Sequence, residues 1–136
     1  MLQRIGVSLE DELLERFDKL IEEKGYTNRS EAIRDLIREK FVEEEWKDSD
    51  NASLGLALLV YDHHELDLSQ KLAEIQHDHF NLIVSTTHIH IDHHNCLEII
   101  ILRGKVKEMR LLGESLVSVK GVKYGKFIPT TTGNKL

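Results

Sequence analysis

All eight histidines of this 136-residue chain lie between His63 and His94, and the only cysteine, Cys96, follows closely. Imidazole is the commonest side chain for binding transition metals, and thiolate is a soft ligand that makes such a site tight. This clustering in a short chain predicts a metal site before it predicts anything else. Whatever fold the chain adopts has to bring these donors together.

The composition is that of a globular protein with one average domain or two small ones, because 40% of the residues are hydrophobic and 31% are charged. The longest apolar run, Leu54–Tyr61, is too short to cross a bilayer, and residues 1–5 do not resemble a signal peptide. One cysteine cannot form an internal disulfide, which fits a reducing cytoplasm. The short apolar run predicts no membrane partner. The net charge of −6 repels nucleic acid, so DNA contact would need a local basic surface.

A polar segment, residues 47–53, has little to bury and predicts a linker between two domains. The pattern before it, over residues 1–46, is mainly helical. The pattern after it, over residues 54–136, is mainly that of strands. The overall fold class predicted is therefore α+β.

The first domain begins with alternation over residues 4–9, which predicts a strand. Ser8 is expected to cap a first helix, which Gly25 ends. Asn28 and Glu31 form the pattern of a capping box at the start of a second helix. The apolar positions that recur at helical spacing are Leu13, Leu14, Phe17, Leu20 and Ile21, and then Ala32, Ile33, Leu36, Ile37 and Phe41.

A strand and two helices within 46 residues cannot bury enough surface to be stable alone, and a single strand has two unpaired edges. We therefore expect a dimer in which two strands pair across a two-fold axis. The outer face of that ribbon would carry Arg4, Gly6 and Ser8 twice, and a two-stranded ribbon fits the DNA major groove. The alternative is a helical dimerisation module with no DNA role.

The second domain follows the order β-α-β-β-α-β, a ferredoxin-like antiparallel sheet with both helices on one face. The expected elements are strand 54–61, a helix with Leu68, Leu72 and Ile75, strands 82–92 and 96–102, a helix over 106–116 and strand 121–129.

Period two places His88 and His90 on one face of a strand, about 6–7 Å apart. The following turn brings Cys96 back beside them. His77 and His79, near the end of the preceding helix, could reach the same metal from this chain or from a neighbour. The remaining histidines flank turns and are expected to be solvated: His63, His64, His93 and His94.

The two domains together resemble the NikR family of nickel-responsive transcriptional regulators. The resemblance covers essentially the whole chain and is carried by Asn28-Arg29-Ser30-Glu31-Ala32-Ile33-Arg34-Asp35, Gln76-His77, His88-Ile89-His90 and Asn95-Cys96-Leu97-Glu98. It implies a homotetramer with central ACT-type domains and two flanking ribbon-helix-helix dimers. It also implies one Ni²⁺ per subunit, bound by His88, His90 and Cys96 of one subunit and His77 of another.

Three imidazoles and a thiolate suit planar four-coordinate Ni²⁺ or Cu²⁺, whereas Zn²⁺ prefers a tetrahedron. The ligand types alone do not choose among these metals, so Cu²⁺ and Zn²⁺ remain possible substitutes. Tyr61 and Glu98 are candidates for orienting the ligands from behind. The alternative is that Tyr61 is a core aromatic and Glu98 an exposed acid.

On the DNA side, Arg4 can contact guanine through two hydrogen bonds, and Ser8 can donate or accept. Gly6 stands where the resembling family usually has a hydrogen-bonding residue, which puts base readout at that position in doubt.

The start of the second helix suits a phosphate group, because Asn28, Arg29 and Ser30 accompany free backbone N–H groups there. Glu31 and Asp35 lie one helical turn apart and could hold a second cation. The simpler account of these two carboxylates is a solvated acidic face.

The resemblance thus implies a non-enzymatic, nickel-responsive repressor that binds palindromic operator DNA. The alternatives are a metal buffer or structural metal site, a small-molecule sensor of the ACT type, and a metalloenzyme. Four protein ligands would leave no open position on the metal, which argues against catalysis.

Overall fold

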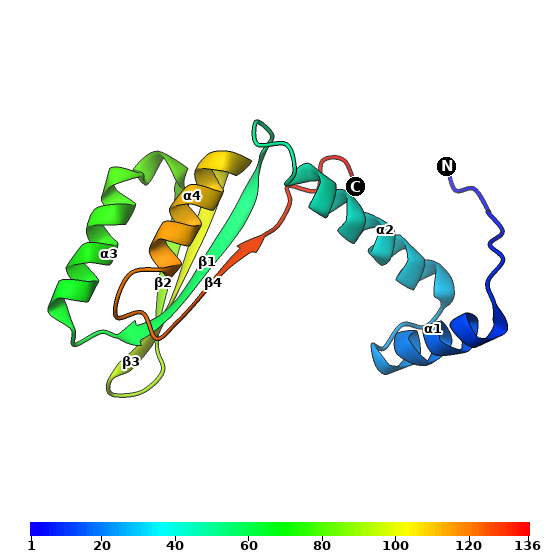
Figure 1. Cartoon of the computed structure of the whole chain (residues 1–136), viewed down its shortest axis with the longest axis horizontal. Helices are drawn as coiled ribbons and strands as arrows, with labels where there is room; N and C mark the ends of the chain where they lie inside the picture. The colour runs from blue at the N-terminus through cyan, green and yellow to red at the C-terminus, as the bar shows by residue number, and fades with distance from the viewer. The chain divides into compact units, whose positions relative to one another are not determined.

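The chain divides into two units, Met1–Lys40 and Phe41–Leu136. The computed structural model describes all 136 residues, and Figure 1 follows the elements by colour along the chain. The α+β class predicted from the sequence is confirmed. No helix combines the length and the hydropathy that crossing a membrane requires.

The N-terminal unit contains α1 (Asp11–Glu23) and most of α2 (Arg29–Glu45). The strand expected over residues 4–9 is absent from the single chain, where residues 1–10 form neither helix nor strand. Its apolar side chains have nothing to pack on, since Ile5 is 79% and Val7 65% exposed. The physical reason is that a lone strand has no neighbour to complete its hydrogen bonds.

The two ends of α1 differ in how well the sequence predicted them. The helix starts after Glu10 and not at Ser8, and Glu10 makes no side-chain capping bond, so the expected serine cap is wrong. The glycine stop is confirmed, because Gly25 has a φ of 83°. Beyond it the Tyr26 N–H donates to the Ile21 carbonyl at 2.9 Å, which closes the last turn.

The start of α2 is capped as expected by Asn28, whose Oδ1 accepts the Glu31 N–H at 3.0 Å. The reciprocal half of the capping box is not made. The Glu31 carboxylate instead accepts a hydrogen bond from the Thr27 hydroxyl at 3.3 Å.

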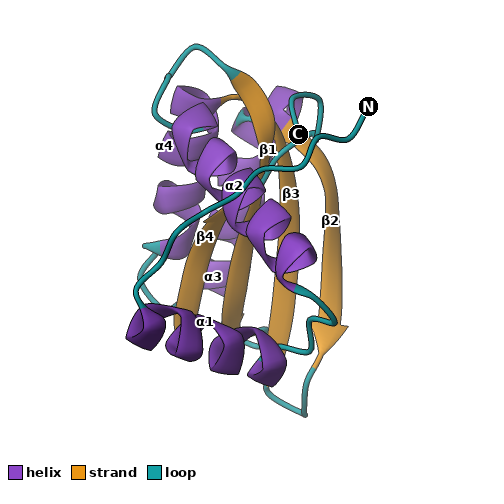
Figure 2. Ribbon diagram, turned by 90° about the vertical axis from the view of Figure 1, so that its right-hand side faces the viewer, coloured by secondary structure: helices purple, strands orange, loops and turns teal.

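The C-terminal unit has the predicted β-α-β-β-α-β order, with a short 3-10 turn, η1, in addition. Its four strands form one antiparallel sheet in the order β2-β3-β1-β4. The helices α3 and α4 cover one face of this sheet (Figure 2). The bounds are β1 Ala52–Asp62, α3 Leu66–Asp78, η1 Phe80–Leu82, β2 Ile83–His90, β3 Asn95–Lys105, α4 Val106–Val117 and β4 Tyr124–Pro129.

The core of this unit lies between the sheet and its two helices. Burial alternates strictly along β1 and β3, so every second residue packs against the helices. The fully buried members include Leu59, Ile100, Leu102, Met109 and Leu116. The opposite face is also apolar but only half-buried, and its residues include Leu56, Leu58, Val60, Leu97, Ile99 and Ile101.

Trp46 fixes the end of α2 to the C-terminal unit. It is 6% exposed, packs edge-on against Phe127 with ring centroids 5.5 Å apart, and donates from Nε1 to the Thr130 carbonyl at 2.7 Å. The guanidinium of Arg110 lies 5.4 Å from its ring. Residues 41–45, the last part of α2, belong to the same unit as Trp46. The linker expected over residues 47–53 remains a prediction.

Candidate metal centre

The sheet brings the three expected ligands of one chain to the same end of the β2–β3 ladder. In the β2–β3 ladder His90 lies directly opposite Cys96, and His88 lies opposite Glu98. Strand alternation puts these side chains on the face that also carries α3. Cys96 is buried at 2% exposure, whereas the His88 side chain is 54% exposed.

A single chain does not arrange three or more donors around one point. His77, the expected fourth ligand, is an exposed residue in the last turn of α3. The types of donor nevertheless fit the metal, because borderline imidazoles and one soft thiolate suit Ni²⁺.

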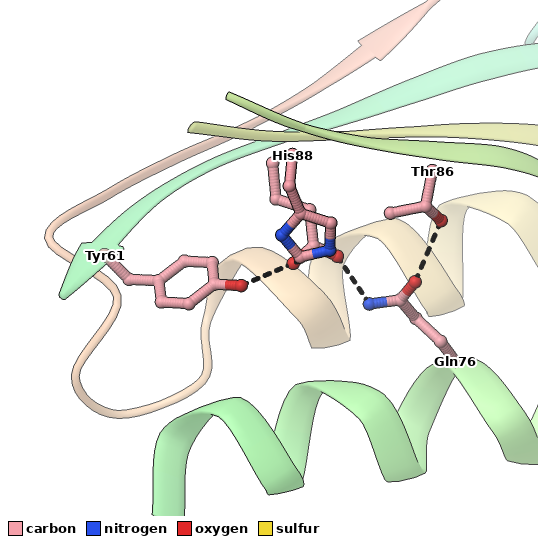
Figure 3. Close-up of polar contacts among 5 residues, drawn as sticks. Tyr61, Gln76, Thr86 and His88 are labelled. Atoms are coloured by element: carbon pink, nitrogen blue, oxygen red, sulfur yellow. Dashed lines mark hydrogen bonds and ion pairs between the residues drawn. The ribbon is translucent and has the colours of Figure 1, made fainter. Parts of the chain in front are cut away.

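Glu98 stands behind these donors as a buried carboxylate, 1% exposed. Its Oε1 accepts a hydrogen bond from the Tyr61 hydroxyl at 2.6 Å, and its Oε2 accepts one from Gln76 Nε2 at 2.6 Å. His88 Nε2 lies 3.5 Å from the same Oε1, and the Thr86 hydroxyl donates to Gln76 at 3.1 Å (Figure 3). The alternative of an exposed acid is therefore wrong for Glu98.

These contacts connect β1, β2, β3 and α3 through one carboxylate (Figure 3). The role of Gln76 and Thr86 was missed by sequence reasoning. The burial of Glu98 could have been predicted from the sequence. Glu98 shares its strand face with Cys96 and Ile100, so it is buried where they are.

The surroundings of the Cys96 thiol disfavour its thiolate form. Burial raises the pKa of Cys96 above its ordinary value, and the charges of Glu98 and Asp62 raise it further, against a lowering by the hydrogen bond with Tyr61. Burial and the bond to Glu98 likewise raise the pKa of Tyr61, so its hydroxyl remains a donor. A metal ion that bound the Cys96 sulfur would have to displace a proton.

The expected DNA-contacting residues lie in the N-terminal unit. Arg4, Gly6 and Ser8 are exposed in the segment before α1, and a Cβ at Gly6 would meet nothing within 4 Å. Arg29 is already engaged, since its Nε and Nη2 bind both oxygens of Asp18 at 2.8 and 2.7 Å. This ion pair was not predicted from the sequence.

The exposed residue Ser30 follows Arg29 in the first turn of α2. The carboxylates proposed for a second cation have protein partners in the same unit. Asp35 accepts a hydrogen bond from the Tyr26 hydroxyl at 2.5 Å, and Glu31 accepts one from the Thr27 hydroxyl at 3.3 Å.

Comparison with known proteins places this chain in a family. A family model for the ribbon-helix-helix proteins of the copG family matches residues 3–44, and one for the NikR C-terminal nickel-binding domain matches residues 54–130, more than half of the chain. The chain belongs to the NikR family. It is thus a member of a family of nickel-responsive regulators with a ribbon-helix-helix DNA-binding domain, and not of an enzyme family.

The relatives span the full length of the chain. A protein of Anaeromyxobacter sp. strain K, named "Putative nickel-responsive regulator", is 56% identical over 138 residues, covering 100% of this chain and 99% of the relative. Proteins of Geobacter sulfurreducens and Geobacter metallireducens with the same name are 55% and 54% identical, each covering 98% of this chain and 96% of the relative.

A solved structure agrees with the fold alone. The uncharacterized protein TM1266 of Thermotoga maritima superposes with a TM-score of 0.52 at 15% identity, over 60% of this chain and 100% of that chain.

Proposed function

We propose that this member of the NikR family is a repressor whose operator binding is promoted by nickel. Each ion is bound by His88, His90 and Cys96 of one subunit and by His77 of a neighbouring subunit, one ion per subunit. The observation that carries the proposal is the ladder register, which sets His90 opposite Cys96 with His88 on the same strand face. Because Cu²⁺ and Zn²⁺ accept the same donor types, they are expected to be possible substitutes.

The assembly we propose is a homotetramer, a dimer of dimers. Two features support it. The segment before α1 carries exposed apolar side chains, among them Ile5 and Val7, that a second copy would pair and cover. The face of the sheet opposite the helices is apolar but only half-buried, which suits contact with another C-terminal unit.

Nickel would act by stabilising one quaternary arrangement. A site whose ligands come from two subunits is complete only in that arrangement, so the bound ion shifts the population toward it. Gln76 precedes His77 on α3 and donates to Glu98, which lies beside His88. The position of α3 is thereby tied to the strand that carries the other ligands.

The DNA contacts we propose come from paired N-terminal strands, with Arg4 and Ser8 facing the bases of a palindromic operator. Gly6, which has no side chain, would leave the position between them unread. Asn28 and Ser30 would lie near phosphate at the start of α2. Arg29 would reach DNA only by leaving Asp18 or by sharing it. Operator DNA as partner implies a cytoplasmic location.

The test has two readouts on the full-length protein. Titration with Ni²⁺ should produce a thiolate-to-nickel charge-transfer band that saturates at one ion per chain and is lost in Cys96→Ala. Operator affinity, measured by fluorescence anisotropy, should rise by at least tenfold when that band is saturated. Equal affinities with and without nickel would remove the regulatory proposal, and a band retained in Cys96→Ala would remove the ligand assignment.

A further inference from the structure

One ion pair in the N-terminal unit joins α1 to the first residue of α2. Nε and Nη2 of Arg29 donate to the two carboxylate oxygens of Asp18 at 2.8 and 2.7 Å. The hydrogen bonds and the charge of Asp18 raise the pKa of Arg29 above its ordinary value. The same hydrogen bonds lower the pKa of Asp18, so both groups are held in their charged forms.

The Asp18 carboxylate occupies the part of the guanidinium that also suits a phosphate group. A guanidinium binds carboxylate and phosphate in the same way, through a fork of two parallel N–H groups. The fork of Arg29 lies at the start of α2, where the N–H groups of the first turn have no acceptor within the helix. Asp18 is therefore an internal oxyanion at the place where backbone phosphate would arrive if this end of α2 approached DNA.

The pair is exposed enough to exchange partners. The side chain of Arg29 is 56% exposed and that of Asp18 is 42% exposed. An ion pair at such exposure contributes little to stability and is weakened further by salt. Its larger effect is on local charge, because Asp18 cancels the charge of Arg29 at the start of α2. A phosphate group has to displace this carboxylate or share the guanidinium with it.

We propose that Asp18 competes with DNA phosphate for Arg29 and so keeps the sequence-independent binding of this protein to DNA weak. The inference rests on the proposed function, because it requires the start of α2 to face phosphate. Binding to DNA of any sequence comes from neutralised phosphates, whereas operator binding also has contacts with the bases. With Arg29 occupied by Asp18, the protein depends correspondingly more on the base contacts proposed for Arg4 and Ser8.

The salt dependence of binding to a fluorescein-labelled duplex of random sequence tests this inference on the full-length, nickel-saturated protein. The logarithm of the binding constant falls with the logarithm of the salt concentration, with a slope of about 0.9 for each phosphate contacted. Asp18→Asn removes the charge and keeps a side chain of the same size. Its slope should be steeper than that of the wild type by about 2, since a paired N-terminal unit carries Arg29 twice. Between about 50 and about 200 mM salt, the variant should lose about tenfold more affinity than the wild type.

The matched control is Asp11→Asn, which makes the same change of charge at an exposed residue of the same helix and should keep the wild-type slope. Asp18→Ala should act as Asp18→Asn does, and Asp18→Asn/Arg29→Gln should return to the wild-type slope. Wild-type slopes in both single variants of Asp18, or a steeper slope that persists without Arg29, would overturn the inference. These slopes are measured without operator, so they hold or fail separately from the response of operator binding to nickel.

Discussion

Replacing Tyr61 with phenylalanine removes one hydroxyl from the buried carboxylate of Glu98 and leaves the ring in place. Tyr61 is 3% exposed and Glu98 is 1% exposed, so water cannot take over the lost hydrogen bond without opening the core. The bond is short, at 2.6 Å, and its acceptor is an acid. A hydrogen bond to a charged group contributes about 1.5–3 kcal/mol, and leaving a buried acceptor short of a donor costs a similar amount.

Loss of ring packing adds nothing to this figure, because Phe and Tyr share the same ring. We therefore expect Tyr61→Phe to lower the free energy of unfolding by about 1.5–3 kcal/mol. Gln76 still donates to the second oxygen of Glu98 at 2.6 Å, which keeps the effect below that of removing the carboxylate's partners altogether.

Urea denaturation of the metal-free protein measures this change in the free energy of unfolding. An unaltered slope of that free energy against urea concentration would indicate that the unfolded state is the same. Tyr124→Phe is the matched control, since Tyr124 is 59% exposed. Its change should stay within about 0.5 kcal/mol. If the two substitutions change the free energy of unfolding by the same amount, the reasoning that ties stability to the Glu98 carboxylate is refuted.

Three further predictions concern other parts of the chain. Gly113→Ala should lower the free energy of unfolding by about 1–3 kcal/mol in urea, because the new Cβ would collide with the Phe127 ring and overpacking outweighs the gain of about 1 kcal/mol in helix propensity. A stabilised variant would contradict this. Asn28→Ala should cost about 1 kcal/mol by leaving the Glu31 N–H without its cap, measured by thermal unfolding, and no change would argue against the cap. Val7→Asp should place a charge in the proposed strand pair and shift the protein toward smaller species in analytical ultracentrifugation, whereas unchanged assembly would place the pairing elsewhere.

The sequence predicted the features that depend on the periodicity of neighbouring residues. Alternation set the strand faces of His88 and His90, and the turn after them set the return of Cys96. The stop at Gly25 and the cap at Asn28 also depend only on neighbours within one helical turn.

What could not be predicted depends on residues far apart in the chain or on a second copy of it. The bond from Gln76 to Glu98 joins residues 22 apart, and the pair of Arg29 with Asp18 joins two helices. The strand over residues 4–9 was expected because its alternation is clear, yet one chain holds no partner for it. Periodicity specifies which face a residue occupies, but not what lies opposite that face.

Because Trp46 is buried in the C-terminal unit, the intrinsic fluorescence of the chain reports on the folding of that unit. Trp46 is the only tryptophan, it lies in the core of the unit Phe41–Leu136, and its ring is held by Phe127, Thr130 and Arg110. Tryptophan emission should therefore follow the melting of that unit alone, while far-ultraviolet circular dichroism records helices from both units. A difference between the two melting curves would give the separate stability of the DNA-binding half without a label or a truncation.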